Sequence, residues 1–266
     1  MSLAAAAAAT ATTAAAAAPT AVAAAADPVG EVRVPLDQIA GLVIPALGDT
    51  IVMVGVTMVI VVLVGIPLGA LVHNTARGGL FEHRVAHAVV GWVVSLGRSL
   101  PFLILMAAII PFTRLITGTN IGIPAAVVPM SLAGIAFFSR IVENALRSVP
   151  PEYGRVARAA GASRLQVIRT AQLAEAVPAI IGGLTINTIA MIEYSAIAGT
   201  IGAGGIGYVA VTYGYQRFDT RVMIATIVIL VLLVALVQLA GDRLARRLTP
   251  RLRLSSRRTR VAEPVV

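Results

Sequence analysis

Lysine and cysteine are both missing from this sequence of 266 residues, and all 21 of its basic residues are arginines. Without lysine there can be no P-loop, because the lysine of that motif holds the β- and γ-phosphates of a nucleotide. Without cysteine the chain can form no disulfide, thiol nucleophile or Cys-ligated zinc site. Paired carboxylates, clustered metal ligands and nucleophile–base pairs are not recognisable either, so the sequence predicts no catalytic residues and no metal site.

Charge is also scarce. Only 12% of the residues are charged and 58% are hydrophobic, whereas an average soluble domain has about 25% charged residues. Such a chain cannot cover its apolar surface with polar groups in water, so its natural solvent is a lipid bilayer.

Five stretches are long and apolar enough to cross a membrane as helices, namely 51–72, 85–112, 115–139, 176–192 and 222–241. The first would be about 33 Å long as a helix, against a hydrocarbon core of about 30 Å. The second is interrupted by Arg98 and then Pro101, and a proline ring removes a helical hydrogen bond and can bend a span. The sequence therefore predicts an all-α integral membrane protein with five transmembrane helices.

The arginines are distributed unevenly between the loops that these five spans would leave. Sixteen lie on the side of the C-terminus and four on the opposite side, with Arg98 inside a span. Cytoplasmic loops carry the excess of basic residues in membrane proteins, so we expect the N-terminus outside and the C-terminus in the cytoplasm. The net charge of +9 is then a topology signal, and no nucleic-acid partner is expected.

The two ends of the chain differ from its middle in composition. Residues 1–26 are nearly all Ala and Thr, which is typical of a low-complexity tail. The first basic residue is Arg33, so the stretch lacks the positively charged n-region of a secretory signal peptide. We divide the chain into an Ala-rich tail and extracytoplasmic segment (1–48), a transmembrane domain (49–243) with a cytoplasmic loop at 148–175, and a basic cytoplasmic tail (244–266).

The cytoplasmic loop has a recognisable helical pattern. The paired prolines at 150–151 suit a helix start, and Gly161 can supply the left-handed residue that ends a short helix. Ser163 followed by Gln166 is a capping-box pattern for a second helix, which we expect to end near Ala174. A helix–Gly turn–helix with small residues on one face could fit a groove on a partner, although an ordinary solvated loop would satisfy the same pattern.

This loop resembles the EAA loop of the permeases of ABC importers, which docks into a cleft on the ATPase subunit. Gly161 and Leu173 match that pattern by position, and Ala157 matches its third letter. Three positions depart from it, with Arg155 in place of Glu, Val156 in place of Ala and Ala174 in place of Pro. The resemblance implies a role in ATPase coupling for Glu152, Arg155, Ala157, Arg158, Gly161, Ala162, Ser163 and Leu173.

The resemblance extends over roughly residues 45–248 and is greatest to the methionine-uptake permeases. It rests on matching stretches at 98–102, 111–114, 118–122, 142–146, 194–196, 202–205, 213–215 and 240–243. It implies a type I importer permease fold in the bacterial plasma membrane, in which two copies of the chain form a homodimer. It also implies two ATPase subunits that bind ATP and Mg²⁺, an extracytoplasmic substrate-binding protein, and no cofactor on this chain.

Glu193 lies at the end of the fourth predicted span, where the resembling permeases have a small residue. A carboxylate within a span costs about 2.5–3.5 kcal/mol, so it should face protein or water rather than lipid. It could line a translocation pathway, pair with Arg98, or lie close enough to the interface to reach water. The candidate pathway residues are Arg98, Pro101, Asn187, Glu193, Tyr194 and Ser195.

One motif in the sequence is misleading. The stretch from Gly202 to Gly207 satisfies G-x-G-x-x-G literally, but a dinucleotide site requires a preceding strand and a following soluble helix. Here the stretch follows a predicted span, so we expect the glycines to permit a break or close helix packing.

The leading functional hypothesis is therefore the permease of an ATP-driven importer that moves D- or L-methionine, or a related amino acid, by alternating access. Two alternatives remain open. One is an ABC importer for a different amino acid or small solute. The other is an ion-gradient-driven secondary transporter that uses Glu193, although the inverted repeats that would favour it are not recognisable.

Overall fold

The computed structural model describes residues 25–26 and 32–248. The predictions made for the Ala-rich tail up to residue 24 and for the basic tail from residue 249 lie outside the described residues. The described part is helical except for one two-residue antiparallel pair, β1 (Ala25–Ala26) with β2 (Val32–Arg33).

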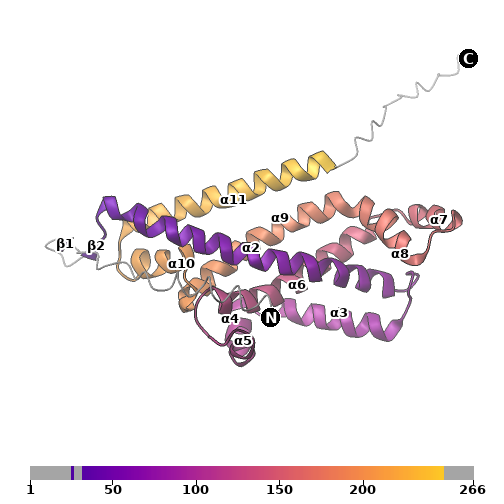
Figure 1. The fold of residues 1–266 in the computed structure, drawn as a ribbon, viewed down its shortest axis with the longest axis horizontal. Coiled ribbons are helices and arrows are strands. Elements are labelled where there is room, and N and C mark those ends of the chain that lie inside the picture. The colour runs from indigo at the N-terminus through magenta and orange to yellow at the C-terminus, as the bar shows by residue number, and fades with distance from the viewer. Residues whose placement is uncertain (1–24, 27–31, 249–266) are drawn as a thin grey trace, which may run out of the picture.

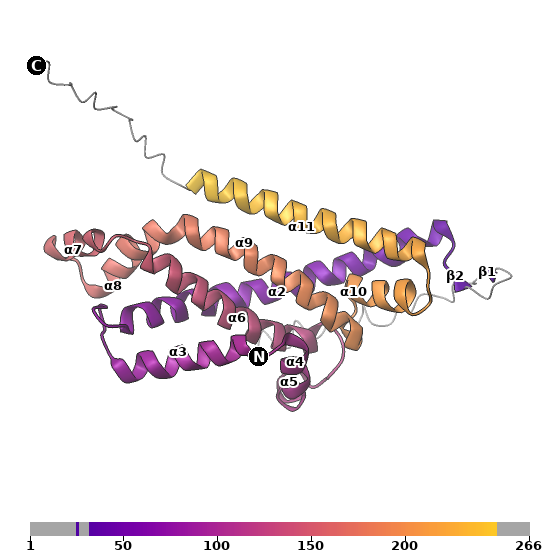
Figure 2. The ribbon, with the colours of Figure 1, turned by 180° about the vertical axis from the view of Figure 1, so that it is seen from behind.

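Four long helical segments run roughly along the long axis of the molecule (Figures 1 and 2). Helices α7 and α8 lie at one end, and α10 and the strand pair lie at the opposite end. The α-helices are α2 (Leu36–Thr75), α3 (Arg84–Ser99), α4 (Phe102–Ala108), α5 (Ile110–Thr117), α6 (Ile123–Arg147), α7 (Pro151–Ala159), α8 (Arg164–Gln166), α9 (Leu173–Ala198), α10 (Gly205–Val209) and α11 (Thr220–Leu248). Three π-helical segments join them, η1 (Val167–Gln172), η2 (Gly199–Ala203) and η3 (Ala210–Tyr215).

Four segments of the described chain are long and apolar enough to cross a membrane: Leu36–Thr75, Ile123–Arg147, Arg164–Ala203 and Thr220–Leu248. A fifth results if α3 and α4, which meet at an angle of 106°, are counted as one span. The prediction of an all-helical membrane protein with several spans is therefore confirmed, as four or five apolar helices.

The first helix begins earlier than the sequence pattern indicated. We expected a span from residue 51 after an extracytoplasmic segment that ends at residue 48, but α2 begins at Leu36 and contains Pro45 and Pro67. Asp49 interrupts the apolar run without interrupting the helix, which explains the error. At 40 residues the helix is about 60 Å long, roughly twice the hydrocarbon thickness of the bilayer.

The second predicted span is divided. Helix α3 ends at Ser99, the chain turns at Leu100, and α4 starts after Pro101 in a different direction. The bend expected from Pro101 is confirmed, but the expectation of one helix over 85–112 is wrong because α4 and α5 follow the bend as short separate helices. The next span is also shifted, since α6 begins at Ile123 rather than at residue 115.

The second helix of the loop does not end near Ala174. Helix α8 continues through η1 into α9, so one helical segment extends from Arg164 to Ala198, and the backbone leaves helical geometry at Ile201 and Gly202. The second helix of the loop and the fourth span are therefore parts of one continuous helix.

Helices α2, α6 and α9 enclose the core. Its largest fully buried side chains include Met53 on α2, Met130 and Phe138 on α6, and Met191 on α9. Helix α11 packs mainly against α9 and leaves most of its own surface exposed, as expected of a helix that faces lipid.

Candidate functional site

The loop between α6 and α9 forms the helix–turn–helix that its sequence predicts. Gly161 ends the first helix with φ of +85°, in the left-handed region that favours glycine. Ser163 then caps α8: its hydroxyl accepts from the N–H of Gln166 at 3.3 Å, and the Gln166 amide oxygen accepts from the N–H of Ser163 at 2.7 Å. Both hydrogen bonds of the predicted capping box are present.

Only one face of helix α7 contacts the remainder of the protein. It has no buried residue, and its Gly154 and half-buried Ala157 lie on the side nearest η1, where Val167 is close to Gly154. On the opposite side Tyr153 and Val156 are exposed, Val156 to 69%. Exposed apolar side chains on a segment outside the spans indicate a surface that another protein covers.

The charged residues of α7 interact mainly with each other. Arg155 forms an ion pair with Glu152 at 2.6 Å, and both side chains are exposed. The pKa of the Glu152 carboxyl lies below its usual range, because a backbone N–H at the helix start donates to it and because Arg155 lies beside it. Arg158 is also exposed. Arg155, which replaces the usual glutamate of the resembling loop, is thus already neutralised within the chain.

The remaining predicted loop residues divide into two groups. Ala162 is half-buried in the turn, whereas Gly161 and Ser163 are exposed there. Leu173 instead packs against the buried cluster that contains Phe138. Leu173 therefore anchors the loop to the spans and does not contribute to its outer surface.

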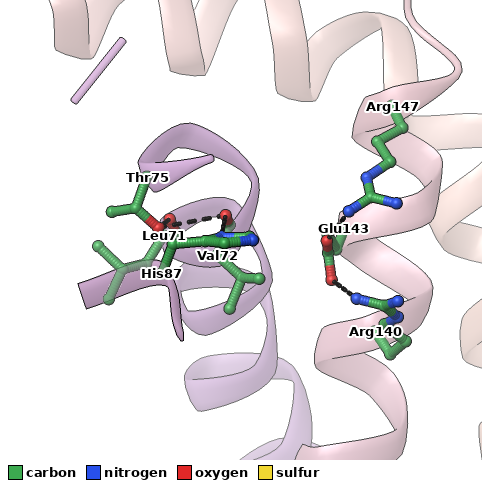
Figure 3. Close-up of polar contacts among 7 residues, drawn as sticks. All are labelled: Leu71, Val72, Thr75, His87, Arg140, Glu143 and Arg147. Carbon is green, nitrogen blue, oxygen red and sulfur yellow. Dashed lines mark hydrogen bonds and ion pairs between the residues drawn. The ribbon is translucent and has the colours of Figure 1, made fainter. Parts of the chain in front are cut away.

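A buried carboxylate near this loop was not predicted from the sequence. Glu143 on α6 has a side chain that is only 1% exposed, and it forms ion pairs with Arg140 at 2.5 Å and Arg147 at 2.6 Å. Figure 3 shows the carboxylate between the two guanidinium groups on the same helix. The i, i+3 and i, i+4 spacing of opposite charges was the signal that could have found it.

The same close-up shows how α3 is tied to α2 (Figure 3). The Nδ1 atom of His87 lies 3.0 Å from the carbonyl oxygen of Val72, and the hydroxyl of Thr75 donates to the carbonyl of Leu71 at 2.8 Å. The His87 contact joins α3 to α2, whereas the Thr75 hydrogen bond lies within the last turn of α2.

At the other end of α9, one aromatic contact joins two of the predicted pathway segments. The rings of Tyr194 and Phe102 stack with centroids 4.3 Å apart, which places Tyr194 next to Pro101 at the start of α4. Asn187 and Ser195 are buried instead. The amide nitrogen of Asn187 lies 3.7 Å from the sulfur of Met58, so these two residues belong to the core of the protomer.

Glu193 and Arg98 are both exposed in the single chain. No ion pair joins them in the described part of the structure, and the guanidinium carbon of Arg98 lies 6.0 Å from the centroid of the Phe137 ring. Within a single chain Glu193 is therefore not paired with Arg98, and the role of Glu193 stays a prediction. Exposed residues recur every seven positions along α9, at 179, 186 and 193, and again at 200 in η2, so Glu193 lies on a face that the chain itself leaves open.

The glycine-rich stretch after α9 combines a chain reversal with close packing. Gly202 and Gly204 have φ of +97° and +82°, and the N–H of Ile206 donates to the hydroxyl of Thr50 on α2 at 2.9 Å. A Cβ atom at Gly207 would lie 2.3 Å from the Cα and carbonyl oxygen of Ala196. Both the break and the close packing expected from the glycines are present, and a helix rather than a strand precedes the stretch.

A small apolar cavity of about 100 Å³ lies between this stretch and α4, α5 and α6, and its lining includes Met106, Ile110, Thr113, Asn120 and Ile201.

Residues 62–254 match the family described as the binding-protein-dependent transport system inner membrane component. The chain belongs to this family. The permease is 44% identical over 210 residues to the probable D-methionine transport system permease protein MetI of Vibrio cholerae, which covers 79% of this chain and 93% of that protein. It is 36% identical over 172 residues to the methionine import system permease protein MetP of Bacillus subtilis, covering 65% and 78% of the two chains.

The fold of the permease is similar to that of a solved ABC transporter. Its TM-score to a chain of the MetNI methionine ABC transporter, in inward-facing conformations, is 0.79, with 37% identity over 81% of this chain and all of that chain. The permease is a multi-pass inner membrane component of a binding-protein-dependent transport system, and the solved chain that it resembles belongs to an ABC transporter. The exposed faces of α7 and α9 are consistent with such an assembly.

Proposed function

We propose that this permease carries methionine, in its D or L form, or a related amino acid across the plasma membrane as part of an ATP-driven importer. The observation that carries the proposal is the 0.79 TM-score and 37% identity to a methionine ABC transporter chain over that chain's whole length. In this proposal five spans cross the membrane with α3 and α4 counted as one, the N-terminus is outside and the C-terminus is cytoplasmic. ATP and Mg²⁺ bind to the ATPase subunits, and this chain catalyses no reaction.

The mechanism that we propose is alternating access driven through α7. Its exposed apolar side, with Tyr153 and Val156, docks into the ATPase subunit. After the turn at Gly161, α8, η1 and α9 form one continuous helical segment from Arg164 to Ala198. Closure of the ATPase pair moves α7, and the continuous helix transmits that movement to the residues near Tyr194. Nucleotide shifts the equilibrium because α7 contacts the two ATPase states differently.

We place the translocation pathway on the open side of α9, where two copies of the permease would face each other. Glu193 is exposed in the single chain, and a carboxylate within a span avoids lipid and faces protein or water. Arg98 is also exposed, and it lies in the last turn of α3, just before the Phe102–Tyr194 stack. We therefore retain four of the predicted pathway residues, Arg98, Pro101, Glu193 and Tyr194. Asn187 and Ser195 instead pack inside the protomer, behind the residues that line the pathway.

Replacing Glu193 with Gln is expected to lower uptake without preventing assembly of the transporter. The carboxylate attracts the ammonium group of an amino acid by about 1 kcal/mol across water at 4 Å, so kcat/KM for transport should fall about fivefold. The measurement is initial uptake rate against substrate concentration in proteoliposomes. Glu175→Gln, an exposed carboxylate at the opposite end of α9, is the matched control, and equal kinetics for both variants would remove Glu193 from the pathway.

The proposed function is tested by uptake of labelled methionine into proteoliposomes that contain this permease, its ATPase and its binding protein, with ATP supplied on the ATPase side. Uptake that requires all three proteins and is blocked by unlabelled methionine is the expected result. If the ATPase is required but methionine is ignored, the chain serves a different solute. If the permease alone takes up solute on an ion gradient, it is a secondary transporter and the proposal fails.

A further inference from the structure

A large cavity at the α7 end of the permease is lined by cationic side chains. It has a volume of about 670 Å³ and lies between the ends of α2 and α6, the α2–α3 connection, and α7. Four arginines and a histidine line it, and none of its lining residues is an aspartate or glutamate. The five are His73, Arg77, Arg147, Arg155 and Arg158.

Two of these arginines lack a partner in the described part of the chain. Arg147 is held by the buried Glu143 at 2.6 Å, and Arg155 by Glu152 at 2.6 Å. Among the described residues, no hydrogen bond or ion pair involves the guanidinium group of Arg77 or Arg158. The nearby Glu82 accepts from the backbone N–H of Gly78 at 3.0 Å, and in the described part of the chain it forms no ion pair with either guanidinium group. The cavity therefore has cationic groups in excess of its anions.

The geometry favours a phosphate group as the missing anion. A guanidinium group presents two parallel N–H donors that match phosphate oxygens, and four such groups line the cavity.

The wall of the cavity also has an apolar side, and its position in the fold favours a lipid over a free phosphate. Leu80, Leu146, Val149 and Val167 belong to the lining, so glycerol and the start of an acyl chain would find apolar contacts beside the cationic groups. Helix α2 ends at Thr75 and α6 at Arg147, so the cavity lies at the ends of two spans, on the side that we assign to the cytoplasm. Basic pockets between spans at the cytoplasmic surface bind anionic headgroups.

We propose that this cavity binds the phosphate of an anionic phospholipid, and that the bound headgroup links α7 to the ends of α2 and α6. Arg147 is positioned for the phosphate by Glu143, and Arg77 and Arg158 supply the unneutralised charge. This site is separate from the translocation pathway, and the proposal is independent of which solute the permease carries.

The experiment uses the whole transporter, permease with ATPase, in nanodiscs of phosphatidylcholine mixed with phosphatidylglycerol. Native mass spectrometry after release into detergent counts the phosphatidylglycerol retained and the ATPase subunits bound. The double variant Arg77→Gln/Arg158→Gln is compared with Arg243→Gln/Arg246→Gln, which removes two arginines from the end of α11, away from the cavity. We expect the unmodified protein and the α11 variant to retain phosphatidylglycerol, and the cavity variant to lose about tenfold or more in apparent affinity.

A second arm separates the two sources of phosphate. Inorganic phosphate is titrated onto the transporter in discs of phosphatidylcholine alone, and the Tm is compared with that in the mixed discs. The lipid assignment predicts that phosphatidylglycerol raises the Tm and inorganic phosphate does not. An equal rise in Tm with inorganic phosphate would overturn the assignment of the cavity to a lipid. Equal retention of phosphatidylglycerol by the two double variants would overturn it as well. Loss of ATPase subunits from the cavity variant with unchanged lipid retention would assign these arginines to the ATPase contact and overturn the proposal.

Discussion

Replacing Val156 with Asp is expected to abolish ATP-driven uptake while the permease itself still folds. Val156 is 69% exposed on a helix that has no buried residue, so the change removes no internal packing. In the assembled transporter the new carboxylate would have to enter an apolar contact with the ATPase, where an unpaired charge is costly. A loss of about 2 kcal/mol or more at such a contact corresponds to roughly thirtyfold weaker association.

The measurement is co-purification of the ATPase with the permease, together with methionine uptake in proteoliposomes. Leu244→Asp is the matched control, because Leu244 is also exposed, at the corresponding end of α11, and receives the same charge. The control should bind the ATPase normally. If both variants bind it equally well, or both lose it, α7 is not the docking element.

Replacing Gly207 with Val is expected to unfold the outer end of the permease. A Cβ atom there would lie 2.3 Å from backbone atoms of Ala196, and two backbones that are fixed by helices cannot both move away. Overpacking usually costs 1–3 kcal/mol, and because the contact here is with the backbone of Ala196 rather than with a movable side chain, we expect a cost of about 3 kcal/mol. The measurement is thermal unfolding of the purified permease in detergent, followed by the fraction that remains monodisperse.

Gly55→Val provides the comparison for this prediction. Gly55 also lies in a helix, but no atom comes within 4 Å of a Cβ built there, and valine is a better helix former than glycine. This variant should unfold within about 1 kcal/mol of the original protein. Equal stability of the two variants would mean that the close contact between α10 and α9 is not needed.

The parts of the fold that the sequence predicts well are those set by local chemistry. The capping box at Ser163, the left-handed Gly161 and the bend at Pro101 depend on one residue and its immediate neighbours, and each is present. The limits of the spans are less well predicted. A charged residue ends an apolar run in the sequence, but it does not end the helix that contains it. Asp49 lies inside α2 for this reason.

The candidate site shows the same division. The outward surface of α7 follows from its own sequence, but the roles of Asn187 and Glu193 depend on which side of α9 the other helices cover. Both lie on the same predicted span, and only packing against α2 and α6 buries Asn187 and leaves Glu193 exposed. The ion pairs of Glu143 with Arg140 and Arg147 can be predicted from the i, i+3 and i, i+4 spacing of these residues. The burial of Glu143 cannot be predicted from that spacing.

The π-helical segment η1 determines the orientation of α7 relative to α9. A π-turn accommodates one residue more than an α-helical turn, so deleting any one residue between Val167 and Gln172 would restore an α-helix there. The loop would then rotate by about 100° and shift by about 1.5 Å relative to α9, and its apolar side would face away from the ATPase. Chain length in this segment, more than residue type, aligns the permease with its partner, so relatives should differ here in sequence far more often than in number of residues.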